Sequence, residues 1–465
     1  MFSLIVLSFL VTSLSKVSCL HLDAKHFGYI LKSSDFIEIR QSPYFIDKTA
    51  LILKTINNDE TLLFTAPPGF GKSTNLDMVR VFLSNTVDNK IAQNVFADTE
   101  ISKDSNFVKT HLGNHPVVYC SLEPTSTVTD YNSMLANYRI SLHNAFSQHQ
   151  YLASSTVLAQ SDVNQFKKFI DANSYASLEP SELSSGLHFL IKALKTHHEK
   201  PVILLIDEYD SVIWESVLTQ GLGISEVLGF YNDVLHKALS DKDNVKKSIL
   251  TGVSTIFFKL LPGLGYTKCV RFLHDRDFES FFGLTGDEVD YLVDRSVYVN
   301  LRPNLTEWYD GYTSPDLSAH IYNTKSFLSF ILLSGGELSS YWSNMKVQKS
   351  LRILLEDRVR KSLLLETPDN LMFVVRELEK VDVGVLEGVK HMITQEIWDS
   401  NVSDLYIHLL TEQGYFTFDK RWERSGYNSS VTLKLANLDV CGALKKFVVN
   451  FIQEMKKQSS NLNIV

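Results

Sequence analysis

Cysteine is scarce in this chain, and its scarcity limits the kinds of site that the protein can build. Of four cysteines in 465 residues, those beyond the first nineteen positions are Cys120, Cys269 and Cys441. Because this set is odd and widely spaced, it excludes a disulfide framework and a thiolate metal site. Cys120 and Cys269 lie in strand-like runs, so we expect both to be small core residues.

An excess of positive charge is also missing. The formal net charge is -8, which argues against a chain built mainly to hold nucleic acid, although it leaves room for a local basic face. The sequence shows no internal repeat, low-complexity run or long block of one charge. With 44% hydrophobic and 21% charged residues, the composition is that of a globular protein, and the length predicts two or three domains.

Residues 1–19 combine a long apolar run with small residues. Phe2 to Leu14 is almost wholly apolar, and Val17 and Cys19 occupy the small-residue positions that precede a signal-peptidase cut. The run is too short to span a bilayer comfortably, so it predicts a cleaved signal peptide and a secreted mature chain without a transmembrane span. The first residues lack Lys and Arg, which keeps two alternatives open: a membrane anchor, or a start placed upstream of an intracellular protein.

Three Asn-x-Ser/Thr triplets are typical of glycosylation acceptors in a secreted chain. They begin at Asn304, Asn401 and Asn428. Because a chain rich in Asn and Ser carries a few such triplets by chance, they add little to the prediction of secretion.

A glycine-containing turn follows the strand-like run at residues 61–65 and precedes a helical pattern. From Ala66 to Ser73 it fits a phosphate-binding loop, with alanine at the first glycine position. Such a loop turns backbone N–H groups toward a polyphosphate, and the helix that follows adds its positive end. The alternative is a strand–helix turn that holds no ligand.

Each loop position has an expected role in holding ATP and Mg²⁺. Gly69 and Gly71 permit the unusual backbone angles and the close approach of the phosphates. Lys72 brings a positive charge to the outer phosphates, and Ser73 offers a hydroxyl to Mg²⁺. The predicted nucleotide-binding residues are Ala66, Gly69, Phe70, Gly71, Lys72, Ser73 and Thr74.

The most apolar run beyond the leader, residues 201–206, ends in two acidic residues. Asp207 can hold Mg²⁺ together with Ser73, and Glu208 can orient and polarise an attacking water. Because ligands of open α/β sheets bind beyond the carboxyl ends of the strands, we expect both carboxylates near Lys72. The alternative is an acidic strand-to-loop junction at the surface.

Strand-like runs separated by helical patterns predict the fold. The runs are residues 62–64, 116–121, 201–206, 248–251 and 269–272, and residues 131–172 show helical spacing. They predict an α/β P-loop NTPase fold with a largely parallel five-stranded sheet covered on both faces. The long interval between Lys72 and Asp207 accommodates the 116–121 strand between the loop strand and the acidic strand. This insertion, with Glu directly after Asp, indicates the branch of P-loop proteins that uses a catalytic glutamate.

Two hydroxyl residues follow the fourth strand, and we consider Thr251 and Ser254 as sensors of the terminal phosphate. The alternative is that these hydroxyls satisfy backbone groups at the strand end. The sequence assigns no arginine finger, and Arg271 and Arg276 are its only suggestions.

The pattern from about residue 285 onward is mostly helical. Residues 308–312 read as an aromatic turn, and a helix at 405–410, a hairpin over 415–434 and a helix from Cys441 suggest a winged-helix-like end. The expected segments are a signal peptide (1–19), an AAA-like P-loop ATPase domain (20–285), a helical domain (286–400) and a winged-helix-like lobe (401–465).

Several motifs follow one another in an order found in a known family. They are Asp35 to Arg40, Tyr44 to Thr49, Gly69 to Ser73, Leu205 to Asp210, Thr251 to Ser254, Trp308 to Tyr312, Tyr322-Asn323 and Gly414 to Thr417. In these motifs the chain resembles the AAA-ATPase-like family, whose bacterial members often carry a C-terminal nuclease-like domain. The resemblance covers nearly all of the mature chain and implies ATP binding and an AAA-like fold.

The chain departs from that family at several points. Pro67 and Pro68 stand where the family usually has arginines, and Thr255 stands where an arginine often follows. Roles of those arginines therefore do not transfer. No late strand carries the Asp and Glu-x-Lys metal site of the nuclease-like domain, so we expect that domain to be absent. A signal peptide is also unusual for the family.

These observations predict Mg²⁺-dependent ATP binding and ATP hydrolysis by a secreted protein, with Glu208 and Lys72 as the catalytic residues. One alternative is a nucleotide-gated interaction or effector protein with little or no turnover, since ATP is scarce outside cells. Another is a nucleic-acid-associated ATPase, which the net charge disfavours. We expect a protein partner of a kind that the sequence does not indicate, and an oligomer stays open.

Overall fold

The structure is a computed structural model, and it describes residues 31–462 except 32, 172, 315–318, 343–349, 357–369, 377, 379–380 and 420–429. The predicted signal peptide and the acceptor at Asn428 lie outside the described residues. Among the described residues, no helix combines the length and the apolar character that a membrane crossing requires.

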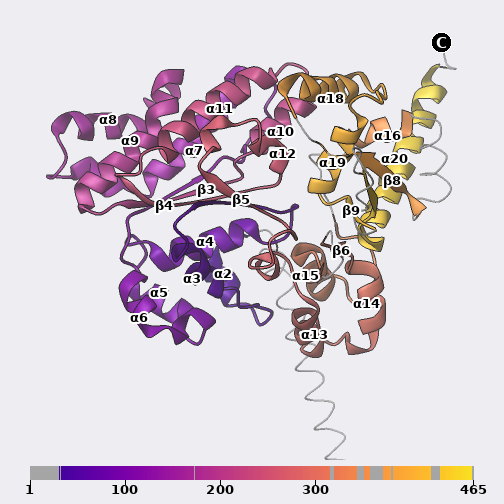
Figure 1. The fold of residues 1–465 in the computed structure, drawn as a ribbon, viewed down its shortest axis with the longest axis horizontal. Helices are drawn as coiled ribbons and strands as arrows, with labels where there is room; N and C mark the ends of the chain where they lie inside the picture. The colour runs from indigo at the N-terminus through magenta and orange to yellow at the C-terminus, as the bar shows by residue number, and fades with distance from the viewer. Residues whose placement is uncertain are drawn as a thin grey trace, which may run out of the picture.

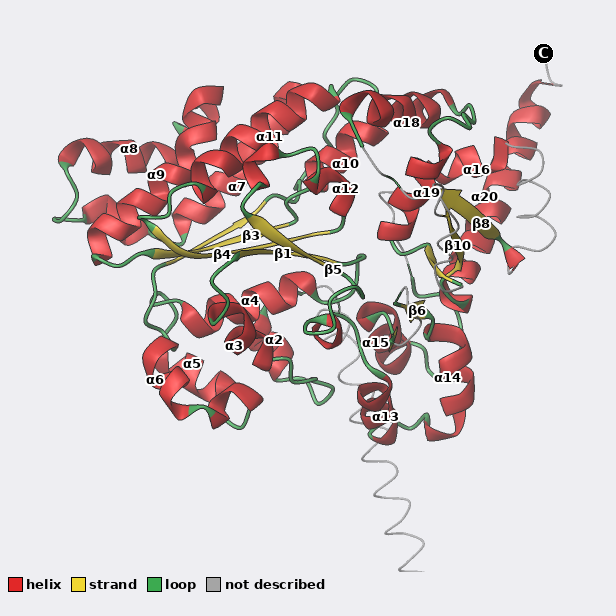
Figure 2. Cartoon of the chain, in the orientation of Figure 1, coloured by secondary structure: helices red, strands yellow, loops and turns green. Residues whose placement is uncertain are grey.

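A five-stranded parallel sheet forms the centre of the molecule (Figure 2). Its strands are β1 (Thr61–Thr65), β2 (Val117–Ser121), β3 (Val202–Asp207), β4 (Val245–Gly252) and β5 (Thr267–Arg271). Every residue of β1 and β3 is buried, as the continuous apolar runs in the sequence require for a sheet covered on both faces. The predicted α/β fold with a parallel five-stranded sheet is therefore confirmed.

The strand order is β2-β3-β4-β1-β5, and it corrects one detail of the prediction. In the sheet, β4 lies between the loop strand β1 and the acidic strand β3, whereas β2 lies at the edge beside β3. Chain order and sheet order differ because the connections between parallel strands cross over the sheet. The carboxyl ends of β1 and β3 therefore face one edge with one strand between them.

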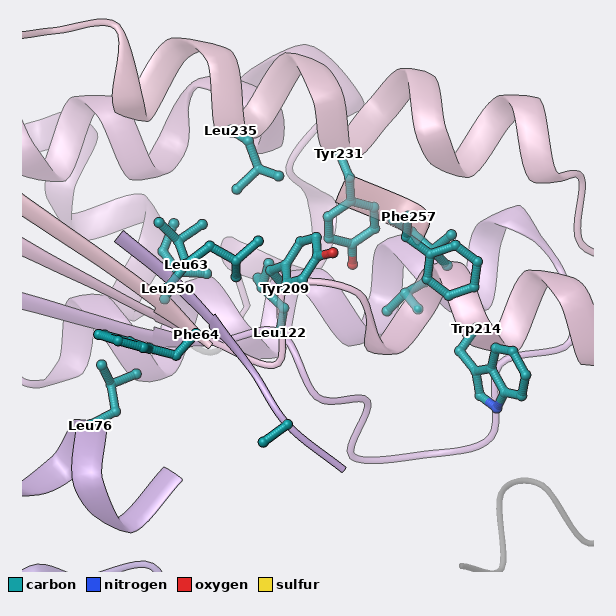
Figure 3. Close-up of a cluster of buried hydrophobic side chains, with 14 of the residues drawn as sticks. Leu63, Phe64, Leu76, Leu122, Tyr209, Trp214, Tyr231, Leu235, Leu250 and Phe257 are labelled. Carbon is teal, nitrogen blue, oxygen red and sulfur yellow. The ribbon is translucent and has the colours of Figure 1, made fainter. Parts of the chain in front are cut away.

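Helices cover both faces of this sheet (Figure 1). One face carries α2 (Phe36–Arg40), α3 (Ala50–Ile56), α4 (Lys72–Leu83), α5 (Asn89–Phe96) and α6 (Ser105–His111). The other carries α7 (Tyr131–Ser147), α8 (Gln160–Ile170), α9 (Pro180–His198), α10 (Ser211–Leu218), α11 (Ile224–Leu239) and α12 (Thr255–Phe258). Successive strand residues serve opposite faces, since Leu63 lies on the side of Leu235 and Phe64 on the side of Leu76 (Figure 3).

A helical lobe follows β5 and has a hydrophobic cluster of its own. It contains α13 (Gly286–Asp294), α14 (Arg302–Tyr309), the short pair β6 (Tyr312–Thr313) and β7 (His320–Ile321), and α15 (Thr324–Leu333). Thr285 caps α13 through a capping box with Glu288. The ring of Tyr312 packs edge-on against Phe70 of the glycine-containing loop, with centroids 4.9 Å apart, and its hydroxyl donates to Gly414 O at 2.9 Å.

The C-terminal region shares its buried cluster with the central sheet. Its elements are α16 (Ile353–Glu356), β8 (Met372–Arg376), α18 (Val383–Gln395), α19 (Ser403–Glu412), β9 (Phe416–Phe418), β10 (Ser430–Leu435) and α20 (Leu438–Leu462). The expected helix, hairpin and helix are present, but β10 also pairs with β8, a strand that the sequence did not predict. The winged-helix-like assignment stays a prediction.

Short 3-10 helices occur between the larger elements. They are η1 (Glu100–Lys103), η2 (Gln150–Ser154), η3 (Tyr175–Ser177), η4 (Pro262–Leu264), η5 (Glu279–Phe281), η6 (Val299–Leu301) and η7 (Ser350–Arg352). They connect elements without adding to the central sheet.

Candidate functional site

The loop between β1 and α4 depends on two glycines. Gly69 has φ +85° and Gly71 has φ +81°, a left-handed region in which a side chain is strained. Gly71 is the N-cap of α4, so the helix begins at Lys72 with its first N–H groups directed into the loop. The backbone therefore has the form that a phosphate-binding loop requires.

The Lys72 side chain lies across this loop. It is only 4% exposed, and its Nζ donates to Ala66 O at 2.9 Å and to Pro67 O at 3.2 Å. The same ammonium lies 3.9 Å from Glu208 Oε1, so it also faces the acidic end of β3. Carbonyl oxygens are weaker partners for an ammonium than phosphate oxygens, and a polyphosphate in the loop would replace them.

Asp207 is fixed by hydrogen bonds from the two neighbouring strands. Tyr119 Oη of β2 donates to Asp207 Oδ2 at 3.2 Å, and the Thr251 hydroxyl of β4 donates to Oδ1. Burial and the neighbouring Asp207 raise the pKa of Tyr119, so this phenol stays a donor at neutral pH. The carboxylate is buried, 3% exposed, and held in one orientation at the strand tip.

Glu208 has a left-handed backbone, with φ +54°, although it is not a glycine. Such a conformation costs free energy and persists only where the surrounding structure enforces it, as it often does at functional sites. Here it turns the chain sharply after β3, and the Glu208 N–H donates to the Thr251 hydroxyl at 3.4 Å. The side chain is 19% exposed and lies close to Lys72.

A cavity of about 560 Å³ joins the two halves of the site. Predicted residues that line it are Gly69, Phe70, Gly71, Lys72, Ser73, Thr74, Asp207 and Glu208. The N-terminal segment contributes Tyr44 and Phe45, and α15 contributes Leu328 and Leu332. The volume lies in the range of small-molecule sites, and the lining combines an apolar end with a charged end.

Three predicted residues are not among those that line this cavity. Ala66 receives the Lys72 hydrogen bond through its carbonyl, and Thr251 acts on Asp207. Ser254 caps α12 and donates its hydroxyl to Glu412 Oε2 at 2.6 Å, so it points to the C-terminal region. Ser254 thus contacts the C-terminal region, whereas Thr251 lies beside the metal-binding candidate Asp207.

Asp210 and Glu412 are functional candidates that the sequence did not single out. Asp210 is 3% exposed and accepts N–H bonds from Val253 at 3.0 Å and Ser254 at 2.5 Å. Burial, followed by the charge of Glu208, raises the pKa of Asp210 to about 7. Glu412 also accepts from Thr255 N at 2.8 Å. Two carboxylates from distant segments therefore hold one loop after β4, which no local pattern signals.

The suggested arginines lie elsewhere. Arg271 lines a small crevice of about 50 Å³ on the other side of the loop, together with His274 and Glu412. Arg276 is exposed, and neither arginine is among the residues that line the larger cavity.

The helical lobe docks directly on the loop, and residues of the Tyr322-Asn323 motif and of α15 make the contact. Asn323 Nδ2 donates to Pro68 O at 2.9 Å, and the Lys325 N–H donates to Gly69 O at 3.0 Å. The N-terminal segment is tied to the same lobe because Lys48 Nζ lies 2.5 Å from Glu288 Oε1. Burial lowers the pKa of Lys48, and Glu288 counteracts that effect.

The chain matches a known protein family. Residues 32–261 match the AAA-ATPase-like family, which is described as predicted AAA-ATPase. The matched segment contains the loop, both acidic residues, Thr251 of β4 and Ser254 after it, and it ends before β5. No curated protein matches the chain significantly.

Proposed function

The chain belongs to the AAA-ATPase-like family, and on this premise we propose that it binds Mg²⁺-ATP in the 560 Å³ cavity and hydrolyses it. One observation carries the proposal: Lys72 of the loop and Glu208 of the acidic strand, which are far apart in the sequence, meet at 3.9 Å beside one cavity. A strand–helix turn that holds no ligand does not require a buried lysine that faces an acidic strand end. A surface junction would not bury Asp207.

The residues present fit a magnesium ion. The Asp207 carboxylate is oriented by two hydroxyl donors, and the Ser73 hydroxyl lines the cavity without a hydrogen-bond partner among the described residues. Oxygen ligands of this kind, completed by phosphate oxygens and water, suit Mg²⁺. When bound, Mg²⁺ would neutralise charge that develops on the phosphates.

The protein groups have separate roles in the proposed hydrolysis. Lys72 exchanges the carbonyls of Ala66 and Pro67 for the outer phosphates, while the loop N–H groups hold the polyphosphate. Glu208 orients a water and accepts its proton as the water oxygen bonds to the terminal phosphorus. The bond from that phosphorus to the bridging oxygen then breaks, which leaves ADP and phosphate.

The first test measures nucleotide binding and phosphate release by the full-length secreted or expressed chain. Lys72→Ala should weaken Mg²⁺-ATP binding by about 10-fold to 100-fold, because a charge-assisted contact is lost. Glu208→Gln should retain binding while turnover falls by about 10² to 10⁴. Lys192→Ala, an exposed lysine on α9, is the matched control. Unchanged ATP affinity in the Lys72 variant would refute the proposal.

A second candidate function is a nucleotide-gated switch with little turnover. The contact of Glu412 with Ser254 and Thr255 favours it, because a segment adjoining the Thr251–Asp207 pair is bonded to the C-terminal region. Steady-state phosphate release separates the two functions. Secretion, and with it the extracellular version of this switch, is a proposal that N-terminal sequencing of the mature chain tests.

A further inference from the structure

Tyr119 is a residue of the site that the sequence did not single out. It lies on the edge strand β2, where it is paired with Leu205 of β3, and it lines the 560 Å³ cavity. Since alternate residues of a strand point to one face, Tyr119 shares a face with Ser121, the residue paired with Asp207. Its phenol reaches along the strand and donates to Asp207 Oδ2 at 3.2 Å. The edge strand therefore supplies a hydrogen-bond donor to the metal-binding candidate.

The two carboxylate oxygens of Asp207 have donors on different sides. The Thr251 hydroxyl donates to Oδ1, and Thr251 is not among the described residues that line the cavity. Tyr119, which donates to Oδ2, is among them, so Oδ2 is the oxygen that is held from the cavity side. Because a carboxylate oxygen has two lone pairs, Oδ2 can accept the phenol bond and still bind a cation or a water of that cation.

A second carboxylate lies near the phenol but has other partners. Burial, followed by the charges of Asp207 and Asp77, raises the pKa of Tyr119. Asp77 of α4 accepts the Phe36 N–H at 2.8 Å through Oδ2 and pairs with Arg80 Nε at 2.5 Å through Oδ1. A phenol has a single hydrogen to donate, and here that hydrogen goes to Asp207. The bond therefore selects the carboxylate at the end of β3.

The backbone of Tyr119 is held from outside the sheet. An edge strand presents backbone groups that have no neighbouring strand to pair with. At Tyr119 the carbonyl accepts a hydrogen bond from Gln148 Nε2 at 3.1 Å, and Gln148 is the C-cap residue of α7. The side chain also packs against the buried cluster of the central sheet. Backbone and side chain are thus both fixed, so the phenol is directed at Asp207 by the fold.

We propose that Tyr119 is a positioning residue for the metal ion of the nucleotide: its phenol holds Asp207 Oδ2 in the orientation in which this carboxylate binds Mg²⁺ or a water of the ion. The inference rests on the proposed function and names a residue that determines how strongly Mg²⁺ improves nucleotide binding. Hydrogen-bond partners that orient a metal ligand change metal affinity by about 10-fold to 100-fold. Because the Thr251 hydroxyl stays on Oδ1 when the phenol is removed, we expect the lower end of this range.

The test measures how much Mg²⁺ improves the affinity of the full chain for a non-hydrolysable ATP analogue. Isothermal titration calorimetry gives the affinity with Mg²⁺ and with EDTA, and the ratio of the two is the gain from the metal. Tyr119→Phe keeps the aromatic ring and removes only the hydroxyl. It should reduce the gain about 10-fold and change the affinity in EDTA by no more than about twofold. A merely structural role would lower both affinities equally.

Two further variants separate positioning from packing. Tyr138→Phe removes a buried phenolic hydroxyl of α7 that has no hydrogen-bond partner among the described residues, so the gain should equal that of the parent. In an Asp207→Ala chain, Tyr119→Phe should have no further effect on the gain, because the phenol acts through that carboxylate. If Tyr119→Phe reduces the gain equally with and without Asp207, the inference is overturned.

Failures of the two proposals are distinguishable. If the parent chain binds the analogue with Mg²⁺ and Lys72→Ala weakens that binding, while Tyr119→Phe leaves the gain unchanged or lowers both affinities equally, the role of Tyr119 is overturned and the proposed function stands. If the parent chain does not bind the analogue, or binds it equally with and without Mg²⁺, both proposals fall. A loss confined to the gain from Mg²⁺ supports both.

Discussion

The two halves of the cavity are held by different parts of the chain. The phosphate-loop half is held by the helical lobe through neutral groups: the Asn323 amide, the Lys325 N–H, and the Gly283 N–H that donates to Phe70 O at 3.0 Å. The acidic half is held through carboxylates, because Asp210 and Glu412 both bind the loop after β4. The phosphate-loop half is therefore held by neutral groups, whereas the acidic half is held by charged groups.

Because of this difference, the two halves should respond to different kinds of substitution. Contacts to a glycine backbone respond to steric change and not to pH. Carboxylates respond to charge substitution and to proton concentration, and a buried partner left without its bond costs more than an exposed one. Steric variants should therefore act on the phosphate half, and charge variants on the acidic half.

The largest effect on stability should come from a matched pair of glycine variants. Gly69→Ala and Gly71→Ala both place a Cβ at positive φ, at a cost of about 1–2 kcal/mol each. A Cβ on Gly69 would also lie 2.8 Å from Asn323 Oδ1, whereas one on Gly71 meets nothing within 4 Å. In thermal unfolding without nucleotide, Gly69→Ala should be the less stable by at least about 1 kcal/mol.

Equal midpoints for these two variants would mean that the docking of α15 on the loop does not contribute to stability. The double variant Gly69→Ala with Asn323→Ala supplies the control. Because the clashing amide is then absent, the added loss caused by Gly69→Ala should shrink toward that of Gly71→Ala.

The next effect concerns Glu412 on the acidic half. Glu412→Ala removes the acceptor of the Ser254 and Thr255 hydroxyls and of the Thr255 N–H, and partly buried donors without partners cost about 1–3 kcal/mol. Urea unfolding should show this loss. Thr255→Val keeps the N–H bond to Glu412, so it should lower the free energy of unfolding by less. If the Glu412→Ala chain is as stable as the parent, the contact does not stabilise the protein.

The parts that the sequence predicted are those encoded by local pattern. Continuous apolar runs gave all five strands of the sheet, and the order of Gly69, Gly71, Lys72 and Ser73 gave the loop, because each depends on neighbours in the chain. Local pattern does not encode the position of β4 between β1 and β3 in the sheet. It also does not encode β8, because its pairing partner β10 follows it by more than fifty residues.

The missed site residues have the same physical origin. Glu412 and Asp210 are ordinary charged residues in helical or turn patterns, and only the fold brings them to the loop after β4. Ser254 is a further example, because its hydroxyl bonds Glu412 of the C-terminal region, a contact that the local sequence does not indicate. Signals that are local in the chain predict the form of the loop, whereas contacts between the lobes become visible only in the fold.

The last effect is a pH dependence confined to the acidic half. The pKa of Asp210 is raised to about 7 by burial and by Glu208, against an ordinary value of 3.8. Asp210 therefore binds a proton more tightly in the folded state than in the unfolded state. Its contribution to the free energy of unfolding is fully present below about pH 4 and is lost as the pH rises through 7. Asp210→Asn should flatten that part of the stability profile, measured by urea unfolding at intervals from pH 4 to pH 8. The Gly69→Ala variant alters only the neutral half, so its stability should change with pH as steeply as that of the parent. If the stability of the parent falls no more steeply than that of Asp210→Asn between pH 4 and pH 8, the raised pKa of Asp210 is contradicted.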